Sequence, residues 1–261
     1  DAGKNRHNMD TLSDIHLGHK TISFKEIVGT GKKEINFSQV ELEIAKNYAA
    51  EDADITFRLY KKFIKSLKSE KLFNIYEIFE KPLIKILAFM EIEGVEVDSK
   101  FLNSLSSKFD KKIKKIEKEV FKISKKEFNI ASPKQLGEII YNDLKIAGTK
   151  KTKKGSFATS ASVLEDLAFK GHEFPKLVLD WRQVSKLKNT YSDALPEHIN
   201  PHTKRVHTSF LLAATTTGRL ASSDPNLQNI PIKSEDGKDI RKAFKAKKDH
   251  LFISADYNQI E

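Results

Sequence analysis

Two carboxylates stand at the end of an apolar run in the sequence F-I-S-A-D-Y-N-Q-I-E, which covers residues 252–261. The run reaches Asp256, and Glu261 follows five residues later. Carboxylate oxygens are the ligands that Mg²⁺ prefers, and metal ions held by carboxylates stabilise the attacking and leaving oxygens of phosphoryl transfer. An aspartate at the carboxyl end of a strand, where the chain leaves the sheet, suits that task. The pattern therefore predicts a strand over 251–255 that presents Asp256 to a metal ion.

Another carboxylate, that of Asp52, interrupts an apolar stripe. The stripe residues lie at steps of four, four, three and four, which places them on one face of a helix: Ile44, Tyr48, Asp52, Ile55 and Leu59. A carboxylate on such a face costs several kcal/mol unless it is hydrogen-bonded or binds a cation. Two interpretations of Asp52 stay open, a hydrogen-bonded structural residue and a metal ligand.

The segment 215–231 is dense in hydroxyl and amide side chains and is bounded by two prolines. It contains Gly218 followed by Arg219, and then Asn226, Gln228 and Asn229. Amide and guanidinium groups are the side chains that reach base edges and sugars in a nucleic-acid groove. The segment is therefore either an ordinary polar loop or a nucleic-acid contact.

The charge balance favours a negatively charged partner. The chain has 261 residues, enough for two domains or one large domain with a substantial core. Its 46 lysines and arginines exceed its 36 aspartates and glutamates, which gives a net charge of +10. Such a balance suggests a polyanion, nucleic acid before an anionic membrane. No apolar stretch approaches the ~20 residues that cross a bilayer, so we expect no membrane partner.

The absence of cysteine excludes disulfides and thiolate metal sites, and it fits a reducing cytoplasm. The first four residues, D-A-G-K, include no initiator methionine and do not resemble a signal peptide. We expect a chain that is cut from something longer.

Helical periodicity dominates the first 200 residues. The pattern predicts a helix from Ser38, which has the capping-box spacing to a glutamate, to about Lys68. A second helix is expected from about Ile75 to Gly94, where the glycine ends it. A third, long helix begins at Ser99.

The third helix carries a heptad-like apolar seam, while its other faces are rich in lysine and glutamate. The seam residues recur at steps of four and three: Phe109, Ile113, Ile116, Val120 and Ile123. Because a second apolar stripe runs over 177–195, we expect two long helices packed antiparallel as an arm. A short helix capped by Ser132 and a basic tip at 150–156 lie between them. The tip is either a solvated loop or a phosphate contact.

After Pro196 the sequence changes to short apolar runs separated by Gly, Pro, Asn and Asp. The runs at 207–214 and 251–255 predict strands. We therefore place one domain boundary near Asn200 and a second near Gly94.

Four segments carry the motifs of one known family. Residues 256–261 (D-Y-N-Q-I-E) resemble a palm motif, usually D-Y-S-Q-I-E, and residues 215–231 resemble a T-x-T-G-R-L-x-S-x-x-P-N-L-Q-N-I-P segment. Residues 181–191 (W-R-Q-V-S-K-L-K-N-T-Y) are similar to a thumb helix, and residues 48–52 to a Y-x-x-x-D exonuclease motif. Taken from the N-terminus, the exonuclease motif, the thumb helix, the 215–231 segment and the palm motif span essentially the whole chain. The chain therefore resembles the family A DNA polymerases of the DNA polymerase I type.

The resemblance implies catalytic roles for the matching acids. Asp256 would be one of two polymerase metal ligands, with the Tyr257 carbonyl assisting. Glu261 would lie against the sugar of the incoming nucleotide, and Tyr257 and Gln259 would also belong to the nucleotide site. Asp52 would be a metal ligand of a proofreading exonuclease site, and Tyr48 would position the attacking water there.

The resemblance also implies a set of DNA contacts. Arg182, Lys186 and Lys188 would hold the template–primer backbone. Arg219 would contact the minor groove at the primer terminus. The other residues expected to contact template–primer are Asn226, Gln228, Asn229 and Lys233.

The sequence therefore predicts an α+β chain that is mostly helical. It would comprise the end of an α/β exonuclease-like domain (1–94), a helical thumb (95–200) and the start of a palm with a partial sheet (201–261). The parent would add deoxynucleotides to a primer on a template, in DNA replication and repair. Its partners would be primer–template DNA, deoxynucleoside triphosphates and the rest of the polymerase chain, and its location the cytoplasm, at the nucleoid.

The chain alone is predicted to bind DNA and to be inactive. The family's second catalytic carboxylate lies in a His-Asp-Glu motif, and a fingers helix binds the nucleotide; this sequence contains neither. The parent would use two Mg²⁺ ions, and we expect this chain not to bind them tightly. Two alternatives stay open: a non-catalytic DNA-binding module, and a remnant of a ribonuclease D-like exonuclease, which the Arg219 and Asp256 motifs disfavour.

Overall fold

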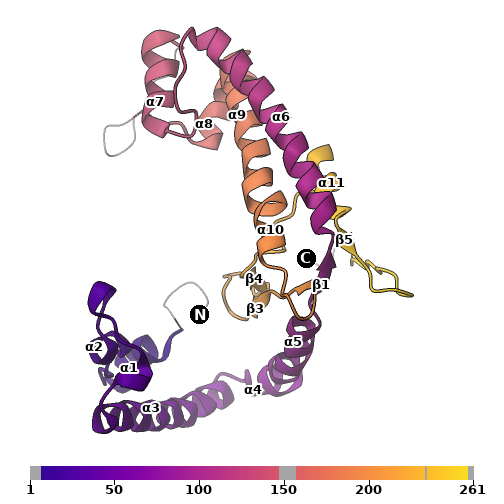
Figure 1. Cartoon of the computed structure of the whole chain (residues 1–261). Helices are drawn as coiled ribbons and strands as arrows, with labels where there is room; N and C mark the ends of the chain where they lie inside the picture. Colours follow the sequence, from indigo (N-terminus) through magenta and orange to yellow (C-terminus); the bar gives the residue numbers. More distant parts are fainter. Residues whose placement is uncertain (1–6, 147–156, 233, 258–261) are drawn as a thin grey trace. The chain divides into compact units, whose positions relative to one another are not determined.

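The computed structural model describes residues 7–146, 157–232 and 234–257. The chain divides into two compact units, one of Asp1–Ile92 with Phe210–Ser223 and one of Glu93–Ser209 with Asp224–Glu261. Both are mostly helical (Figure 1). The predicted class, an α+β chain dominated by helices, is confirmed.

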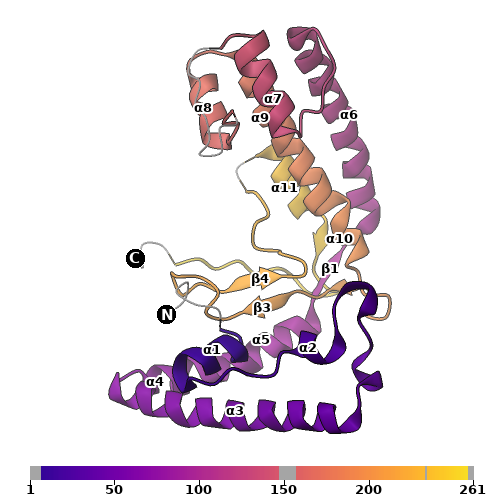
Figure 2. The ribbon, with the colours of Figure 1, turned by 90° about the vertical axis from the view of Figure 1, so that its left-hand side faces the viewer.

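The first unit is built around one long helix, α3 (Leu42–Ser69), against which α1 (Met9–Leu17) and α2 (Phe24–Val28) pack. Figure 2 shows α1 lying along α3. Ile55 and Leu59 of the predicted stripe are buried, whereas Ile44 near the start of the helix is 44% exposed. The stripe therefore buries the middle of α3 and leaves its first turn exposed.

The predicted N-cap at Ser38 is wrong. Asn36 instead caps a 3₁₀ turn, η2 (Phe37–Gln39), in a capping box with Gln39. The Asn36 side chain accepts from the backbone N–H and the hydroxyl of Ser38, so the Ser38 hydroxyl is a donor there. The helix α3 begins at Leu42, three residues after η2 ends at Gln39.

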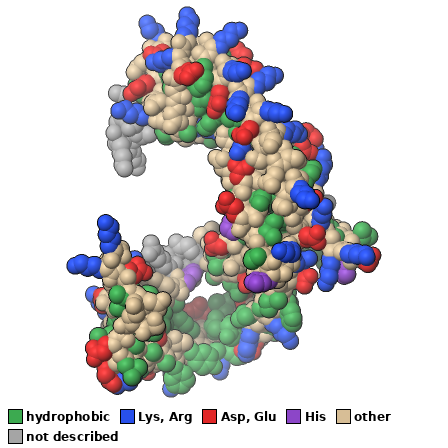
Figure 3. All heavy atoms as spheres, in the orientation of Figure 1, with side chains coloured by type: hydrophobic (Ala, Val, Ile, Leu, Met, Phe, Trp, Pro, Cys, Tyr) green, Lys and Arg blue, Asp and Glu red, His purple; other side chains and the backbone are tan. Residues whose placement is uncertain are grey.

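After α3 the chain continues through α4 (Phe73–Ile75), a π-turn η3 (Tyr76–Glu80) and α5 (Lys81–Glu93). Gly94 ends α5 with a φ of +58°, as predicted. Helix α5 buries Leu87 but exposes apolar side chains on other faces, and Figure 3 shows hydrophobic side chains gathered over this helix. These exposed residues are Ile84, Ile86, Phe89, Met90 and Ile92.

The second unit is organised by α6 (Ser99–Ser124) and α9 (Glu173–Leu187), with α9 continuing through a π-turn η5 (Lys188–Ser192) into α10 (Ala194–Glu197). Three contacts establish the direction of packing. Trp181 donates to Glu117 (3.0 Å), Lys188 lies 3.5 Å from Asp110, and Ser106 donates to Asp193 (2.6 Å). Because the partners on α6 descend as those on α9 ascend, the predicted antiparallel pair is confirmed (Figure 1).

The core of this unit lies along the α6–α9 seam and beneath the short helices that close it. These are α7 (Pro133–Glu138), which Ser132 caps as predicted, a π-turn η4 (Ile139–Asp143), and α8 (Ala161–Phe169). The buried core residues of the two long helices are Leu102, Leu105, Phe109, Ile116, Val120, Phe174, Val178, Val184 and Leu187. The basic tip at 150–156 lies outside the described residues.

A three-stranded antiparallel sheet, ordered β2-β1-β5, stands at the base of α6. Its central strand is β1 (Val95–Val97), flanked by β2 (Arg205–Val206) and β5 (Phe244–Lys245). Glu96 pairs with Arg205 on one side and with Lys245 on the other, which places opposite charges directly across the strands.

The strands predicted from apolar runs are only partly correct. The run 207–214 contains β3 (Ser209–Leu211), which pairs with β4 (Ala221–Ser223), but the chain turns at Ala213, where φ is +56°. The run 251–255 is exposed and forms no strand. A strand needs a neighbour for its backbone N–H and C=O groups, and no described residue pairs with this run. None of the helices in the described ranges is long and apolar enough to cross a membrane.

Helix α11 (Glu235–Arg241) is fixed to α6 by ion pairs. Lys108 Nζ lies 2.7 Å from Asp239 Oδ2, and Lys112 pairs with Asp236. The hydrogen bond from Lys108, reinforced by one from Lys242, lowers the pKa of Asp239 to about 2. Ile240 on the same helix is fully buried.

The left-handed backbone at Gly94 leaves no room for a side chain. A Cβ there would lie 2.6 Å from the Val206 carbonyl oxygen. We expect Gly94→Ala to lower the free energy of unfolding by about 2 kcal/mol more than Gly171→Ala. Gly171 is the matched control, since its φ is +91° but nothing lies within 4 Å of its Cβ position. Urea unfolding followed by fluorescence of the single tryptophan, Trp181, measures both; equal losses would contradict the collision.

The low pKa of Asp239 predicts a pH-dependent contribution to stability. Because its folded pKa, about 2, lies below the ordinary 3.8, the contribution is fully present at neutral pH and is lost as pH falls from about 4 to 2. Asp239→Asn should cost about 1 kcal/mol at pH 7, a value discounted because Lys108 is largely exposed. The same substitution should cost almost nothing near pH 2. Urea unfolding at both pH values tests this, and a pH-independent cost would contradict it.

Candidate nucleic-acid interface

Arg182 lies on α9 and is anchored inside the protein. Its Nη1 donates to the backbone carbonyl of Thr159, 2.6 Å away, and Thr159 is itself buried. Burial lowers the pKa of the guanidinium from its ordinary value. One face of this arginine therefore ties α9 to the segment that precedes α8.

Lys188, in η5, is neutralised by two carboxylates. Its Nζ lies 2.6 Å from Asp193 Oδ2 and 3.5 Å from Asp110 Oδ1, and its side chain is only 17% exposed. The hydrogen bond to Asp193 raises the pKa of Lys188 and outweighs the effect of burial. The cation is thus held by the protein itself and presents little net charge to an outside anion.

Lys186, unlike Arg182 and Lys188, is not held by other groups in the part of the chain that the structure describes. It is exposed on the last turn of α9, and no carboxylate pairs with it among the described residues. Of the three basic residues that the sequence assigned to the DNA backbone, Lys186 is therefore the one that offers an uncompensated charge.

Residues 224–231, which we call the amide loop, turn their larger apolar side chains inward and their amide side chains outward. Leu227 and Ile230 pack against the hydrophobic core, whereas Asn226, Gln228 and Asn229 are exposed. Asn226 Oδ1 accepts from the backbone N–H of Gln228 (3.0 Å), which leaves the amide NH₂ group of Asn226 as a donor. The loop thus presents a row of three amides on the outside of the second unit.

The other two predicted DNA contacts stand apart from this row. Arg219 is exposed and belongs to the first unit, where its backbone carbonyl accepts from the Thr215 hydroxyl (2.8 Å). Lys233 lies outside the described residues. The structure therefore brings together the three amides and the α9–η5 lysines within one unit, and it describes Arg219 separately.

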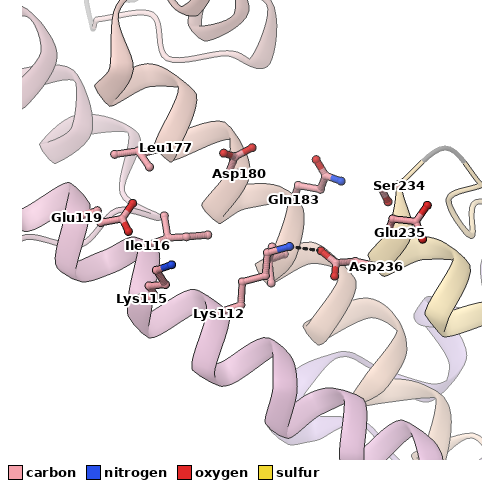
Figure 4. A pocket seen from close by; sticks show the side chains of 11 residues that line it. Lys112, Lys115, Ile116, Glu119, Leu177, Asp180, Gln183, Ser234, Glu235 and Asp236 are labelled. Atoms are coloured by element: carbon pink, nitrogen blue, oxygen red, sulfur yellow. Dashed lines mark hydrogen bonds and ion pairs between the residues drawn. The ribbon is translucent and has the colours of Figure 1, made fainter.

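A pocket of about 440 Å³ opens between α6, α9 and α11 (Figure 4). Its lining includes two lysines, Lys112 and Lys115, and Lys112 pairs with Asp236. The carboxylates that line it are those of Glu119, Asp180, Glu235 and Asp236. Four carboxylates against two ammonium groups would repel a phosphate, so this pocket is not the nucleic-acid site.

The palm-motif residues are exposed as far as the structure describes them. Asp256 and Tyr257 both lie at the surface, and Tyr257 is 82% exposed. Gln259 and Glu261 lie outside the described residues. Within the described ranges, no three His, Cys, Asp or Glu side chains form a group that could hold a metal ion. The described donors by themselves therefore do not complete a two-metal centre, and we assign no chemical step to a metal here.

The exonuclease-like pair, Tyr48 and Asp52, lies one turn apart on α3. Asp52 Oδ1 is buried, and no hydrogen-bond partner reaches it within the described part of the chain. Tyr48 packs with Phe24 and Phe37. Burial raises the pKa of the Tyr48 hydroxyl, and the neighbouring Asp52 carboxylate raises it further. A hydrogen bond with the Asp52 side chain contributes to the raised pKa of Tyr48, so only the Oδ1 oxygen of Asp52 is buried without a partner among the described residues.

Several interactions around these sites escaped the sequence analysis. Glu51, beside Asp52, accepts from His19 (2.7 Å) and from the backbone N–H of Ile22 (2.6 Å). These bonds, that of Ile22 first, lower the pKa of Glu51 and fix the segment before α2 to α3. Tyr191 was assigned only to an apolar stripe, yet its hydroxyl bonds the amide loop. The signal available was that a tyrosine on a buried stripe needs a partner for its hydroxyl.

Two family models match this chain, and curated relatives align along its whole length. A family model described as "DNA polymerase family A" matches residues 99–261, and one described as "3'-5' exonuclease" matches residues 2–68. The DNA polymerase I of Rhizobium leguminosarum is 49% identical over 261 residues, and that of Pseudomonas aeruginosa 44% over 262. Each alignment covers 100% of this chain but only 26% and 29% of the relatives.

One solved structure resembles most of the chain. It is described as the "POL domain of Pol1 from M. smegmatis complex with DNA primer-template and dNTP", with a TM-score of 0.78 and 29% identity. The match covers 95% of this chain and 40% of that one. Because the family model covers more than half of the sequence and the relatives align along its whole length, this chain belongs to DNA polymerase family A.

Proposed function

We propose that this chain is part of a template-directed DNA polymerase and that its second unit holds primer–template duplex. The observation that carries the proposal is the presence on one unit of an unpaired lysine and an outward row of amides. Lys186 supplies charge for the phosphate backbone. Asn226, Gln228 and Asn229 supply donors and acceptors for sugars and base edges.

The comparisons support DNA as the ligand. The mycobacterial neighbour, which shares the fold at 29% identity, is described as a complex with primer-template and dNTP. Proteins that bind duplex without sequence preference combine backbone charge with contacts at the groove edges. The exposed residues of this unit provide both kinds of contact.

The catalytic assignments stay proposals. We infer that Asp256 is one carboxylate of a Mg²⁺ site and that Tyr257, Gln259 and Glu261 belong to the nucleotide site. Their support is the family membership and the exposure of Asp256, whose carboxylate is open to a ligand. When bound, Mg²⁺ would stabilise charge on the reacting phosphate oxygens.

We also infer that the chain functions as part of a longer polypeptide. It spans about a quarter of the length of its curated relatives. The apolar side chains that α5 exposes support this, because contiguous exposed apolar patches mark interaction surfaces. The parent would act on DNA in replication and repair, in the cytoplasm at the nucleoid.

A second candidate function is proofreading by the first unit. The orphaned Asp52 Oδ1 and the exonuclease family match favour it. The remaining alternative, a non-catalytic DNA-binding module, is distinguished by the full reading frame: a fingers helix and a His-Asp-Glu motif after Glu261 would exclude it.

Lys186 should set part of the salt dependence of DNA binding. We expect Lys186→Ala to reduce the slope of log binding constant against log salt by roughly 0.9, because one phosphate contact is lost. The loss should be the same for unrelated duplex sequences. Fluorescence anisotropy with a labelled primer–template measures the slope.

The matched control is Lys176→Ala, which removes one exposed lysine from the same helix. Its slope should equal that of the unchanged chain. If Lys186→Ala and Lys176→Ala lowered the salt slope equally, only total charge would matter and the backbone contact of Lys186 would be contradicted. A loss of affinity confined to one DNA sequence would contradict it too.

The chain by itself should not extend a primer. The single carboxylate assigned to metal binding, that of Asp256, does not hold the pair of metal ions that phosphoryl transfer needs. Incubation with primer–template, deoxynucleotides and Mg²⁺ should leave the primer length unchanged. Extension that depends on Mg²⁺ and disappears in Asp256→Asn would refute this.

A further inference from the structure

Three side chains from separate parts of the chain donate hydrogen bonds to the backbone carbonyls of the amide loop. Tyr191 Oη donates to the Asn229 carbonyl (2.5 Å), and Thr208 Oγ1 donates to the Pro225 carbonyl (2.9 Å). Arg241 donates from Nη2 to the Ile230 carbonyl (3.1 Å) and from Nε to that of Pro231 (3.4 Å). A loop has no ladder to satisfy these carbonyls, so side chains hold the backbone in place of a neighbouring strand.

These bonds decide which way the loop side chains point. With the carbonyls held inward and Leu227 and Ile230 packed on the core, the three amides are left on the outer surface. The loop also lies close against α11, since a Cβ at Gly237 would come within 2.7 Å of the Pro231 carbonyl oxygen. The backbone of the loop is therefore fixed at both ends and in the middle.

Tyr191 makes the middle bond, and it is the best placed to act on the amides. Its side chain is 1% exposed, so it does not touch a ligand on the surface. Its hydroxyl bonds the backbone carbonyl of Asn229. The side chain of Asn229 is one of the three exposed amides and follows that of Gln228. Burial raises the pKa of its hydroxyl, so the group stays protonated and remains a donor at neutral pH.

We propose that Tyr191 is a positioning residue for the amide contact with primer–template DNA. It acts through the Asn229 carbonyl, which orients the amides of Asn229 and Gln228 toward the polar edges of the duplex. The inference rests on the proposed function of the second unit and adds to it a buried group that sets the geometry of the contact. Holding a loop in its bound conformation raises affinity because less freedom is lost on binding.

The test compares Tyr191→Phe with Tyr141→Phe. Both substitutions remove one hydroxyl from a buried tyrosine of the same unit, and Tyr141 also donates to a backbone carbonyl, that of Ala158 (3.0 Å). We expect Tyr191→Phe to weaken binding of labelled primer–template about fivefold, with an unchanged salt slope because no charge is lost. Tyr141→Phe should bind DNA like the unchanged chain.

A double-mutant cycle separates positioning from general destabilisation. In a chain that carries Asn226→Ala, Gln228→Ala and Asn229→Ala, Tyr191→Phe should have no further effect on DNA affinity. Hydrogen exchange of the backbone amides of residues 226–230 should quicken in Tyr191→Phe and not in Tyr141→Phe. Thr208→Val, which removes a second uncharged donor to the loop, gives the same test if Tyr191→Phe does not fold.

The outcomes distinguish the two proposals. If the unchanged chain fails to bind primer–template, the proposed function falls and this inference with it. If the chain binds but Tyr191→Phe and Tyr141→Phe behave alike, only the inference is overturned. It is also overturned if the Tyr191→Phe loss persists in full without the three amides.

Discussion

Apolar packing between α6 and α9 determines where the polar groups of the second unit stand. Phe109 and Val120 of α6 are fully buried, and Val184 and Leu187 of α9 are 2% exposed. Each such side chain contributes roughly 1.5–3 kcal/mol when it leaves water. Sliding or rotating one helix would expose several of them together, so hydrocarbon fixes the register of α9. Lys186 faces solvent because Val184 and Leu187, on either side of it, face the core.

The same register separates two lysines that look equivalent in the sequence. Lys186 and Lys188 are two residues apart, about 200° around a helix. One stands in solvent, whereas the other lies between Asp193 and Asp110 and serves the packing of η5 on α6. A net charge of +10 therefore overstates the charge that the protein offers to an anionic partner. The charge available to bind an anion is carried by side chains that make no ion pair within the described part of the protein, such as Lys186.

Local signals predicted the helical part of the fold, and long-range contacts account for what they missed. The apolar residues of the α6 seam recur every three or four positions, so both this helix and its antiparallel partner were predicted from spacing within short stretches of sequence. A strand at 251–255 would need a neighbouring strand to pair with, and the sequence of the run does not specify that neighbour. No strand forms over these residues. The bond from Tyr191 to Asn229 joins positions 38 apart, which no periodicity reveals. The candidate amides were visible in the sequence; the groups that orient them were not.

The π-turn η5 restricts how this chain can change in length. A π-turn holds one residue more than the α-helical turn it replaces, and η5 lies between the core positions of α9 and the buried Leu195 of α10. Deleting one residue from Lys188–Ser192 would restore α-helical winding and leave Leu195 facing the core, because the π-turn already accommodates the extra residue. Inserting one more residue would instead rotate everything that follows by about 100° and move Leu195 out of the core. In descendants of this sequence, the exposed Asn189 and Thr190 are free to vary in composition, and the segment loses a residue more readily than it gains one.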